Sequence, residues 1–290
     1  MSNRVPAWSL AVAAMLSVQL GAALSTSLFP MVGPAGTSWL RLTMGALIFL
    51  AMKRPRLRGL AFRDVRVVLA LGIATGVLTT AFLSAVDRIP LGTAVAIEFL
   101  GPLGVAVARS HSRRSLVWPA LALLGVLLLT EPWQGDVDLV GVAFAVLSGL
   151  SWATYIVLTQ QVGDRFAGLE GLSVTIPIAA VTAALVGVPQ AWGHLTWGVL
   201  AAAFGLALLL PVIPFSLELM ALRRLTTAAF GTLMALEPAM AVVAGLVLLG
   251  QVPMTWQILG VVLVVCAGIG AERGGHRDAE PARFEPLGTA

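Results

Sequence analysis

Long apolar runs alternate with short polar gaps along the chain as far as about residue 271. Each run comes close to or exceeds the length of about 20 apolar residues with which a helix crosses a bilayer. The runs cover residues 7–28, 35–52, 65–86, 92–108, 115–131, 139–161, 170–189, 196–221, 227–249 and 254–271. The gaps carry Pro, Gly or charged residues, which suits tight connections between neighbouring helices. The pattern therefore predicts an all-α membrane protein with ten transmembrane helices.

Composition favours a membrane protein over a soluble one. The chain is 58% hydrophobic and 11% charged, with a mean hydropathy of +0.94, whereas a soluble domain carries about 25% charged residues. The net charge of +4 and the pI near 10.5 would suggest nucleic-acid binding in a soluble protein. Here the basic residues lie in short gaps between apolar runs. We therefore interpret them as topology signals and expect the lipid bilayer, not nucleic acid, as a partner.

Basic residues are distributed very unevenly between the two sides of the predicted bundle. With the N-terminus placed inside, 16 of the 18 Lys and Arg residues fall in inner segments, Arg88 falls outside and Arg41 falls within a span. Because cytoplasmic loops carry the excess of positive charge, we expect an even number of spans and cytoplasmic termini. The first segment resembles a signal peptide. It is long enough to span, so we expect it to remain as the first helix.

Ten spans divide into two sets of five, and the halves show weak internal similarity. Five is odd, so a duplicated half enters the membrane in the opposite direction. Three pairs of residues fall on one another when the halves are stacked: Ser17 and Ser148, Arg88 and Arg224, and Pro102 and Pro238. Inverted repeats of this kind, with broken helices near the midplane, are typical of secondary transporters.

This reading divides the chain into three parts. Residues 1–135 form the first five-helix repeat, and residues 136–271 form the second, inverted five-helix repeat. Residues 272–290 are polar and rich in Pro and Gly, and this composition is typical of a disordered tail. We expect that tail to be cytoplasmic.

Glu237 is a candidate site residue because it is an acid within an apolar run. It lies about ten residues past the inner start of its predicted helix, or roughly 15 Å deep at about 1.5 Å per residue. Pro238 follows directly and frees the carbonyl four residues back, that of Met234. An acid beside a free carbonyl can bind a proton or an ammonium group. The alternative is a structural glutamate at a helix kink.

Glu98 is the second such acid, and its helix also carries a proline. Pro102 is four residues on, so the freed carbonyl is that of Glu98 itself. An amino-acid ammonium would suit both the carboxyl group and this carbonyl. Arg41 is predicted to lie at a similar depth. It is expected either to contact substrate or to form an ion pair with Glu98, and these roles are compatible.

Further polar residues and prolines lie within predicted spans. Gln19 and Tyr155 are mid-span in two apparently equivalent helices, where each is expected either to hydrogen-bond a substrate or to join helices. Pro211 and Pro214 make their helix irregular, which marks either a gate or a packed kink. Glu218 lies near the inner face of the same helix, where it can snorkel, pair or take part in transport.

Several chemistries have no signature in the sequence. There is no Walker A loop for ATP. The three histidines, His111, His194 and His276, fall in loops or the tail, so no intramembrane metal cluster is predicted. No serine–histidine dyad lies within the membrane either. We therefore expect neither an enzyme nor a bound metal or cofactor.

Three segments carry a family resemblance: STSLFPMVGPAGTSWLRL, AVDRIPLGTAVAIEFLGPLGVA and PFSLELMALRRLTTAAFGTLMALEPAMAVVAGLVLLG. Together they resemble the EamA-type branch of the drug/metabolite transporter superfamily, and most of all the bacterial threonine/homoserine exporters. The LEP motif that holds Glu237 is common in the branch, and the AIEFLGPL segment that holds Glu98 is the more specific pointer. Gln251 is a departure, because many relatives have an acid after LLG.

The resemblance implies a ten-helix fold of two inverted five-helix repeats. It implies a central cavity lined by helices one to four and six to nine, with helices five and ten peripheral. It also implies efflux of amino acids or related metabolites from bacterial cells across the inner membrane, in exchange for protons.

The leading hypothesis is an exporter of small amino acids that works by proton antiport and alternating access. Glu98 and Glu237 are expected to contact protons or the substrate amine. A second hypothesis keeps the fold and changes the cargo to other metabolites or hydrophobic cations. A third is a membrane sensor or scaffold that does not transport. The sequence does not predict the oligomeric state.

Overall fold

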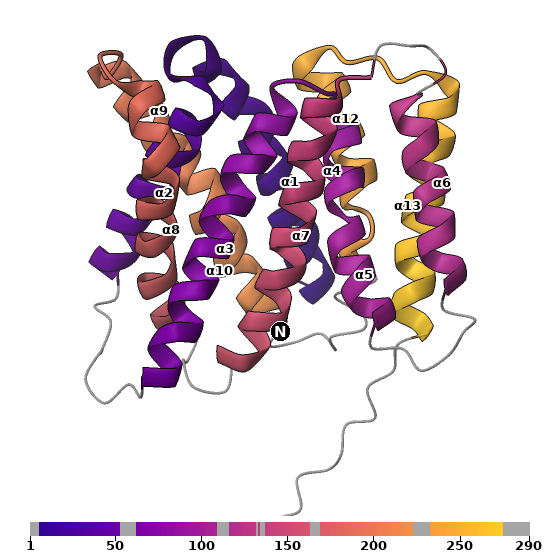
Figure 1. The fold of residues 1–290 in the computed structure, drawn as a ribbon, viewed down its shortest axis with the longest axis horizontal. Helices are drawn as coiled ribbons and strands as arrows, with labels where there is room; N and C mark the ends of the chain where they lie inside the picture. The colour runs from indigo at the N-terminus through magenta and orange to yellow at the C-terminus, as the bar shows by residue number, and fades with distance from the viewer. Residues whose placement is uncertain are drawn as a thin grey trace, which may run out of the picture.

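The regular elements of the computed structural model are all helical (Figure 1). The structure describes residues 6–52, 62–108, 116–131, 133, 137–162, 169–222 and 233–274. In the first half these are α1 (Ala7–Ser25), the short 3-10 helix η1 (Thr26–Leu28), α2 (Phe29–Met52), α3 (Phe62–Val86), α4 (Leu91–Glu98), α5 (Leu100–Ala108) and α6 (Val117–Thr130). In the second half they are α7 (Leu139–Val162), α8 (Leu169–Ala191), α9 (Trp197–Ala207), the π-helical turn η4 (Leu208–Val212), α10 (Ile213–Leu222), α12 (Glu237–Leu249) and α13 (Thr255–Gly274).

The helices have the length and composition of membrane spans. Five stretches of the described chain are long and apolar enough to cross a bilayer: Trp8–Met52, Val65–Val86, Leu139–Thr159, Gly171–Ala191 and Trp197–Glu218. Four shorter apolar helices lie among them. Large apolar side chains such as Leu185 and Val247 are more than 70% exposed, which suits contact with lipid. The chain is therefore an all-helical membrane protein with several apolar spans.

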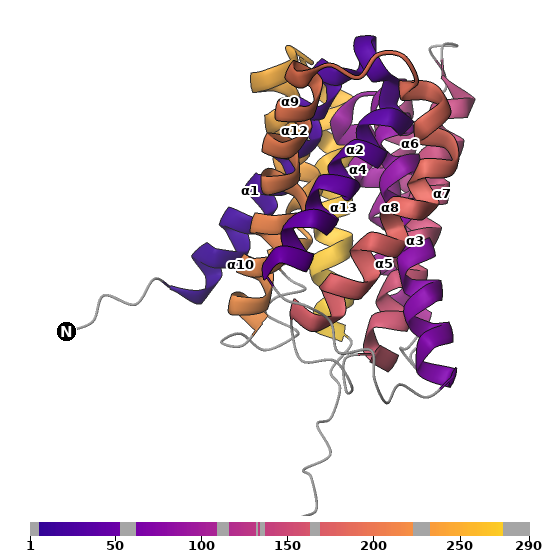
Figure 2. The ribbon, with the colours of Figure 1, turned by 90° about the vertical axis from the view of Figure 1, so that its left-hand side faces the viewer.

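Helices of the first half pack against helices of the second half. The most extensive packing joins α2 to α8, α3 to α7 and α6 to α13. Additional pairs join α1 to α10 and α4 to α12 (Figures 1 and 2). The core is accordingly divided among several buried clusters between helix pairs. Every main interface therefore joins the two halves of the chain.

Glycines allow some of these helices to approach very closely. A Cβ atom on Gly72 would lie 2.5 Å from the Cβ of Ile178, and one on Gly76 would lie 2.7 Å from the carbonyl oxygen of Ala179. These two glycines, four residues apart in α3, therefore form a close contact with α8, as small residues do between membrane helices. Gly125 of α6 and Gly260 of α13 form a comparable contact, with each missing Cβ 2.6 Å from the other's carbonyl oxygen.

Two of the expected spans are broken, and a third belongs to a longer helix with a break just before the expected start. The run 35–52 belongs to a helix that begins earlier, at Phe29, and is interrupted at Gly33 (φ 67°) before Pro34. The run 92–108 divides at Phe99 into α4 and α5, next to the carbonyl freed by Pro102. The run 196–221 breaks at Leu210, before Pro211. Pro214 lies in the first turn of α10, where proline is tolerated, so of these two prolines only Pro211 marks a break.

The position of Glu237 within its helix differs from the prediction. Residues 223–232 lie outside the described part of the chain, and a turn at Ala235 and Leu236 precedes α12. Leu233 and Met234 are helical, and after the turn Glu237 is the first residue of α12. The prediction places Glu237 within one continuous helix, whereas the structure breaks that helix just before it. Its depth in the membrane stays a prediction. Pro238 suits the first turn of a helix because its missing N–H is not needed there. At the other end of the chain, α13 extends to Gly274 and includes three residues of the expected tail; residues 275–290 lie outside the described ranges.

Candidate functional site

A cavity of about 420 Å³ lies between the two halves of the bundle. Its volume is within the range of about 300–1,000 Å³ that small-molecule sites occupy. All five residues predicted to bind substrate or protons line it: Gln19, Arg41, Glu98, Tyr155 and Glu237. Pro102 and Pro211 also line it. Pro214 and Pro238 are buried outside its lining, so a direct gating contact is not supported for these two.

The cavity is lined almost entirely by the helices that the family resemblance implies. Side chains come from α1, α2 and α3, from α4 and α5, from η4 and α10, and from α7, α8 and α12. Among the described residues, α6 contributes none of the lining and α13 contributes only Gly268. The helix pair α6 and α13 is thus peripheral to the site.

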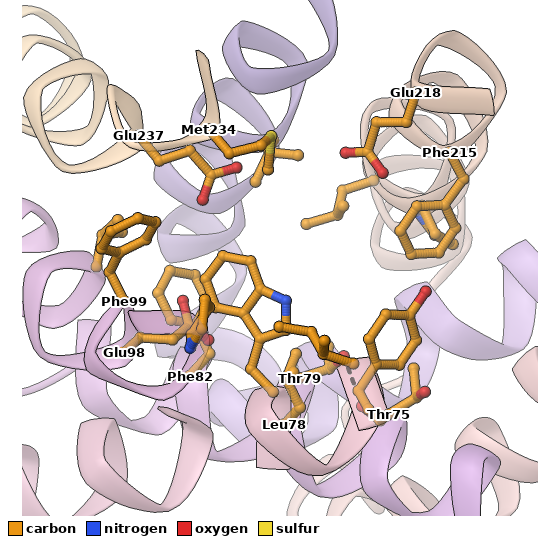
Figure 3. A pocket seen from close by; sticks show the side chains of 18 of the residues that line it. Thr75, Leu78, Thr79, Phe82, Glu98, Phe99, Phe215, Glu218, Met234 and Glu237 are labelled. Atoms are coloured by element: carbon orange, nitrogen blue, oxygen red, sulfur yellow. Dashed lines mark hydrogen bonds between the residues drawn. The ribbon is translucent and has the colours of Figure 1, made fainter. Parts of the chain in front are cut away.

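Three carboxyl groups face the cavity (Figure 3). Glu98 ends α4 and Glu237 begins α12, so each lies at a helix break, and both are less than 10% exposed. Figure 3 shows Glu218 on the other side of the hollow from Glu98 and Glu237. Glu237 is within electrostatic range of the other two. The sequence leaves open whether Glu218 snorkels, pairs near the inner face or takes part in transport. In the structure it lines the same cavity as Glu98 and Glu237.

The carboxyl group of Glu98 is held by a serine of α7. The Ser148 hydroxyl is within hydrogen-bond distance of Glu98 Oε1 and lies 3.1 Å from the carbonyl oxygen of Leu78. A serine hydroxyl has one proton to donate. When Ser148 donates to Leu78, a protonated Glu98 can donate to Ser148; when Glu98 is ionised, Ser148 can donate to it instead. The network therefore accommodates both protonation states of Glu98.

The sequence suggests that the backbone carbonyl of Glu98 is open to a ligand, but in the structure this carbonyl does not face the cavity. A Cβ atom on Gly149 would lie 2.8 Å from that oxygen, so the carbonyl faces the backbone of α7. A Cβ on Gly101 would likewise lie 2.0 Å from the Gly149 oxygen. The break between α4 and α5 is thus packed directly on α7. Only the side chain of Glu98 is available to a ligand.

Arg41 is buried in α2 and lines the cavity without a carboxylate partner. It is 2% exposed. Its Nη1 donates to the Ser25 hydroxyl (3.2 Å), which in turn donates to the Gly21 carbonyl oxygen (2.5 Å). Its Nε has no hydrogen-bond partner in the described part of the chain. The expected ion pair between Arg41 and Glu98 is not formed.

Gln19 of α1 is buried in the same cavity wall. It is 2% exposed, and within the described ranges its Oε1 accepts no hydrogen bond. This oxygen is therefore not used to join helices. Tyr155 lies on the α7 side of the cavity. Arg41 Nε and Gln19 Oε1 are thus a buried donor and a buried acceptor in the wall of one cavity, and neither has a hydrogen-bond partner among the described residues.

One face of α7 carries a stripe of polar and aromatic side chains, of which only Tyr155 is predicted above as a site residue. Ser148, Trp152, Tyr155 and Thr159 recur at intervals of three or four residues, which places them on one face of a helix. The last three line the cavity, and Ser148 binds Glu98. Trp152 also packs edge-on against Phe99, with ring centroids 6.4 Å apart. A polar and aromatic stripe within an apolar run thus identifies the site-facing side.

At the upper end of the bundle in Figure 1, where α8 leads into α9 and α12 into α13, polar side chains join the two halves of the chain. Gln190 Oε1 accepts from the backbone N–H groups of Ala35 (2.7 Å) and Gly36 (3.0 Å), next to the break in α2. Gln251 Oε1 accepts from the N–H of Leu91 (3.1 Å), the first residue of α4. Each glutamine thus satisfies a helix start in the opposite half.

An ion pair also joins the two halves of the chain at this end of the bundle. Arg88 Nη1 lies 3.1 Å from Asp138 Oδ2, joining the α3–α4 turn to the start of α7. The backbone N–H of Gly141 donates to Asp138 Oδ1 (2.8 Å). This hydrogen bond and the neighbouring Arg88 hold the pKa of Asp138 below its ordinary value. No group of three or more His, Cys, Asp and Glu suited to a metal occurs among the described residues.

An all-helical membrane protein whose halves enclose a largely apolar cavity with a few buried acidic and polar side chains resembles membrane carriers in architecture. Comparison with known proteins agrees. The model of the EamA-like transporter family matches residues 139–270. The chain is 38% identical over 281 residues to the threonine/homoserine exporter RhtA of Escherichia coli (strain K12) and 37% identical over 280 residues to that of Salmonella typhimurium (strain SL1344). Both alignments cover 93% of each chain.

The chain therefore belongs to the EamA-like transporter family. It is a member of a transporter family and not an enzyme. A solved crystal structure is similar in fold, with a TM-score of 0.60 and 19% identity, over 95% of this chain and all of that one.

Proposed function

We propose that this chain is a secondary transporter of the bacterial inner membrane that exports small amino acids such as threonine and homoserine in exchange for protons. The observation that carries the proposal is the cavity between the halves, in which buried acids and a buried arginine face one space. Intramembrane charged groups mark substrate pathways and proton relays because their burial is costly without such a role. The names of the relatives supply the class of substrate.

The proposed topology is ten spans in two inverted repeats, residues 1–135 and 136–271, with both termini cytoplasmic. In it, α4 and α5 form one span, and α9 to α10 form another. Helix packing supports this arrangement because exchanging the halves maps the α1–α10 pair onto the α7–α3 pair. The pairs α2–α8, α4–α12 and α6–α13 each map onto themselves.

Two hydrogen bonds support the same relation between the halves. Ser17 of α1 donates to the carbonyl oxygen of Leu209 (2.7 Å), and Ser148 of α7 lies 3.1 Å from that of Leu78. Both the two serines and the two leucines are separated by 131 residues in the sequence. One contact is therefore repeated with the roles of the halves exchanged.

Proton exchange is supported by the three carboxyl groups in one cavity. Charging all of them at once in a space poor in water is costly. Protons or a substrate ammonium group can relieve that cost in turn, which couples the two. Alternating access then rocks one repeat against the other around the cavity, and the upper end of the bundle is assigned to the periplasmic side.

Counterflow in proteoliposomes tests the proposal. Purified protein is reconstituted with internal unlabelled threonine, and uptake of labelled threonine is measured with and without a pH gradient. We expect accumulation that depends on the gradient, and loss of that dependence in Glu237→Gln. The matched control is Asp87→Asn, which removes an exposed acid outside the cavity. Absence of counterflow for threonine and homoserine would refute the cargo, and gradient-dependent transport by Glu237→Gln would refute its role.

Hydrophobic cations are a second cargo that one observation favours. Aromatic side chains, among them Phe82, Phe99 and Phe215, line the same cavity as the three acids (Figure 3), and aromatic faces attract cations. A panel of organic cations in the same counterflow assay separates the two cargoes. The amino-acid proposal requires that threonine compete better than the cations do.

A further inference from the structure

We infer that Arg41 binds the carboxylate of the transported molecule, so that the cavity selects substrates carrying both a free carboxylate and a free ammonium group. The inference rests on the proposed function and assigns the chemistry of its site. Its basis is the combination, in one cavity, of an arginine and three acids that form no ion pair with one another or with any other residue that the structure describes.

The guanidinium of Arg41 is held in place yet left incomplete. The Ser25 hydroxyl accepts a hydrogen bond from Nη1 and donates one to the Gly21 carbonyl oxygen, which fixes the guanidinium against α1. The Nε donor stays unmatched among the residues described, although Arg41 is 2% exposed. An unmatched buried donor is costly, and a buried charge without a counter-charge is more so. A ligand carboxylate would supply both the acceptor and the charge.

Arginine suits this task better than other cations. Its planar fork matches the two oxygens of a carboxylate, and Nε belongs to the edge that can make such a paired contact. A purely structural role for Arg41 would require a carboxylate partner within the protein. The acids that face the cavity are Glu98 from α4, Glu218 from α10 and Glu237 from α12, and no ion pair joins any of them to Arg41 in the described part of the chain.

The rest of the polar lining suits the other end of an amino acid. When ionised, Glu98 and Glu237 are hydrogen-bond acceptors. Gln19 Oε1, which has no partner among the described residues, is a third acceptor. An ammonium group offers three donors to such a set. A ligand with one charge would leave one pole of the cavity unmatched, whereas a zwitterion matches both. Selectivity then arises from the cost of the unmatched pole.

The test compares threonine with analogues that each lack one charge. Competition against labelled threonine counterflow is measured for threonine, threoninamide and N-acetylthreonine on the full chain in proteoliposomes. We expect each analogue to compete on the order of 10- to 100-fold more weakly than threonine, the range for a lost charged hydrogen bond. Equal competition by threoninamide would overturn the inference while leaving threonine transport, and so the proposed function, intact.

Variants of Arg41 show whether this residue is responsible. Arg41→Gln is expected to weaken threonine to the level of threoninamide while threoninamide itself is unchanged. Arg41→Lys, which keeps the charge without the fork, is expected to recover part of the preference. Arg88→Gln removes a guanidinium at the upper end and is expected to keep the wild-type ratio. An equal loss for both ligands in Arg41→Gln would overturn the assignment, and the wild-type panel decides the matter if that variant fails to fold.

Discussion

The upper end of the bundle and the central cavity differ in how completely their polar groups are paired. At the upper end, Gln190 and Gln251 satisfy helix starts from the other half, and Arg88 pairs with Asp138. In the cavity, the Nε of Arg41 and the Oε1 of Gln19 have no partner among the described residues. Since a buried group without a partner costs about 1–3 kcal/mol, the contrast separates groups that hold the protein together from groups that await a ligand.

This contrast gives each region a different expected response to mutation. A change at the upper end removes a bond that is already made, so it should lower stability. A change in the cavity removes a group that the empty protein does not use, so it should affect transport and leave stability nearly unchanged. Measuring both properties for each variant tests whether the division holds.

The largest effect is expected for Glu98→Gln. The amide keeps nearly the same shape and an oxygen that accepts from Ser148, so the melting temperature should stay close to that of the wild type. Transport of threonine should fall on the order of 100-fold, because a charged hydrogen bond to the substrate amine is lost. Counterflow rates and melting curves in the same detergent measure the two properties. A large drop in stability with transport retained would place Glu98 among the structural groups.

The largest effect on stability is expected for Gly33→Ala. Gly33 has a φ of 67°, and a Cβ atom there would lie 2.2 Å from the Cδ of Gln190. With a ψ of 171° as well, this backbone conformation is essentially restricted to glycine, so the substitution should cost about 1–3 kcal/mol in backbone strain. Displacing Gln190 should add about 1–3 kcal/mol for each unmatched N–H group.

Gly193→Ala is the matched control for this variant. Gly193 also has a positive φ, of 79°, but open space where a Cβ would lie, so it should show the strain alone. Equal melting temperatures for the two variants would contradict the contact between Gly33 and Gln190.

A smaller and opposite effect is expected for Gln251→Glu. This change places a carboxylate at the start of α4, where it still accepts from the N–H of Leu91 and also meets the positive end of the helix dipole. The gain should be about 0.3–1 kcal/mol. Gln251→Ala should instead lose about 1–3 kcal/mol because the Leu91 donor is left unmatched. Chemical denaturation of the three proteins at neutral pH compares them, and a glutamate variant less stable than the alanine variant would contradict the proposed contact.

The sequence predicts the site residues better than it predicts their surroundings. Glu98, Glu237, Arg41, Gln19 and Tyr155 are identifiable because a polar group in an apolar run is costly wherever the chain folds. All five line one cavity. Local sequence also indicates the breaks near Pro102 and Pro211, because proline removes a hydrogen bond in any helix.

Contacts between distant segments are beyond the reach of such local rules. Nothing in the sequence near Gln190 indicates that it meets Ala35, because 155 residues separate the two. The same holds for Ser148 and Glu98, which are 50 residues apart. The Arg41–Glu98 ion pair, one of the two roles expected for Arg41, is not formed for a related reason, since similar depth in the membrane does not fix which helix faces which. Gly33–Pro34 is a missed signal, because this dipeptide favours a break.

The smallest effect is expected for Asp138→Asn, and it should depend on pH. The Gly141 N–H and Arg88 hold the pKa of Asp138 below its ordinary value, so the folded protein favours the ionised form. The resulting stabilisation is fully present above the unfolded pKa and is lost as pH falls through the lower folded pKa. The exposed pair should raise the melting temperature only slightly. The wild type and the variant should therefore differ a little at neutral pH and converge in acid, with Asp87→Asn as a control that leaves this difference unchanged. A gap that widens as the pH falls would show that the carboxylate of Asp138 is not the stabilising form.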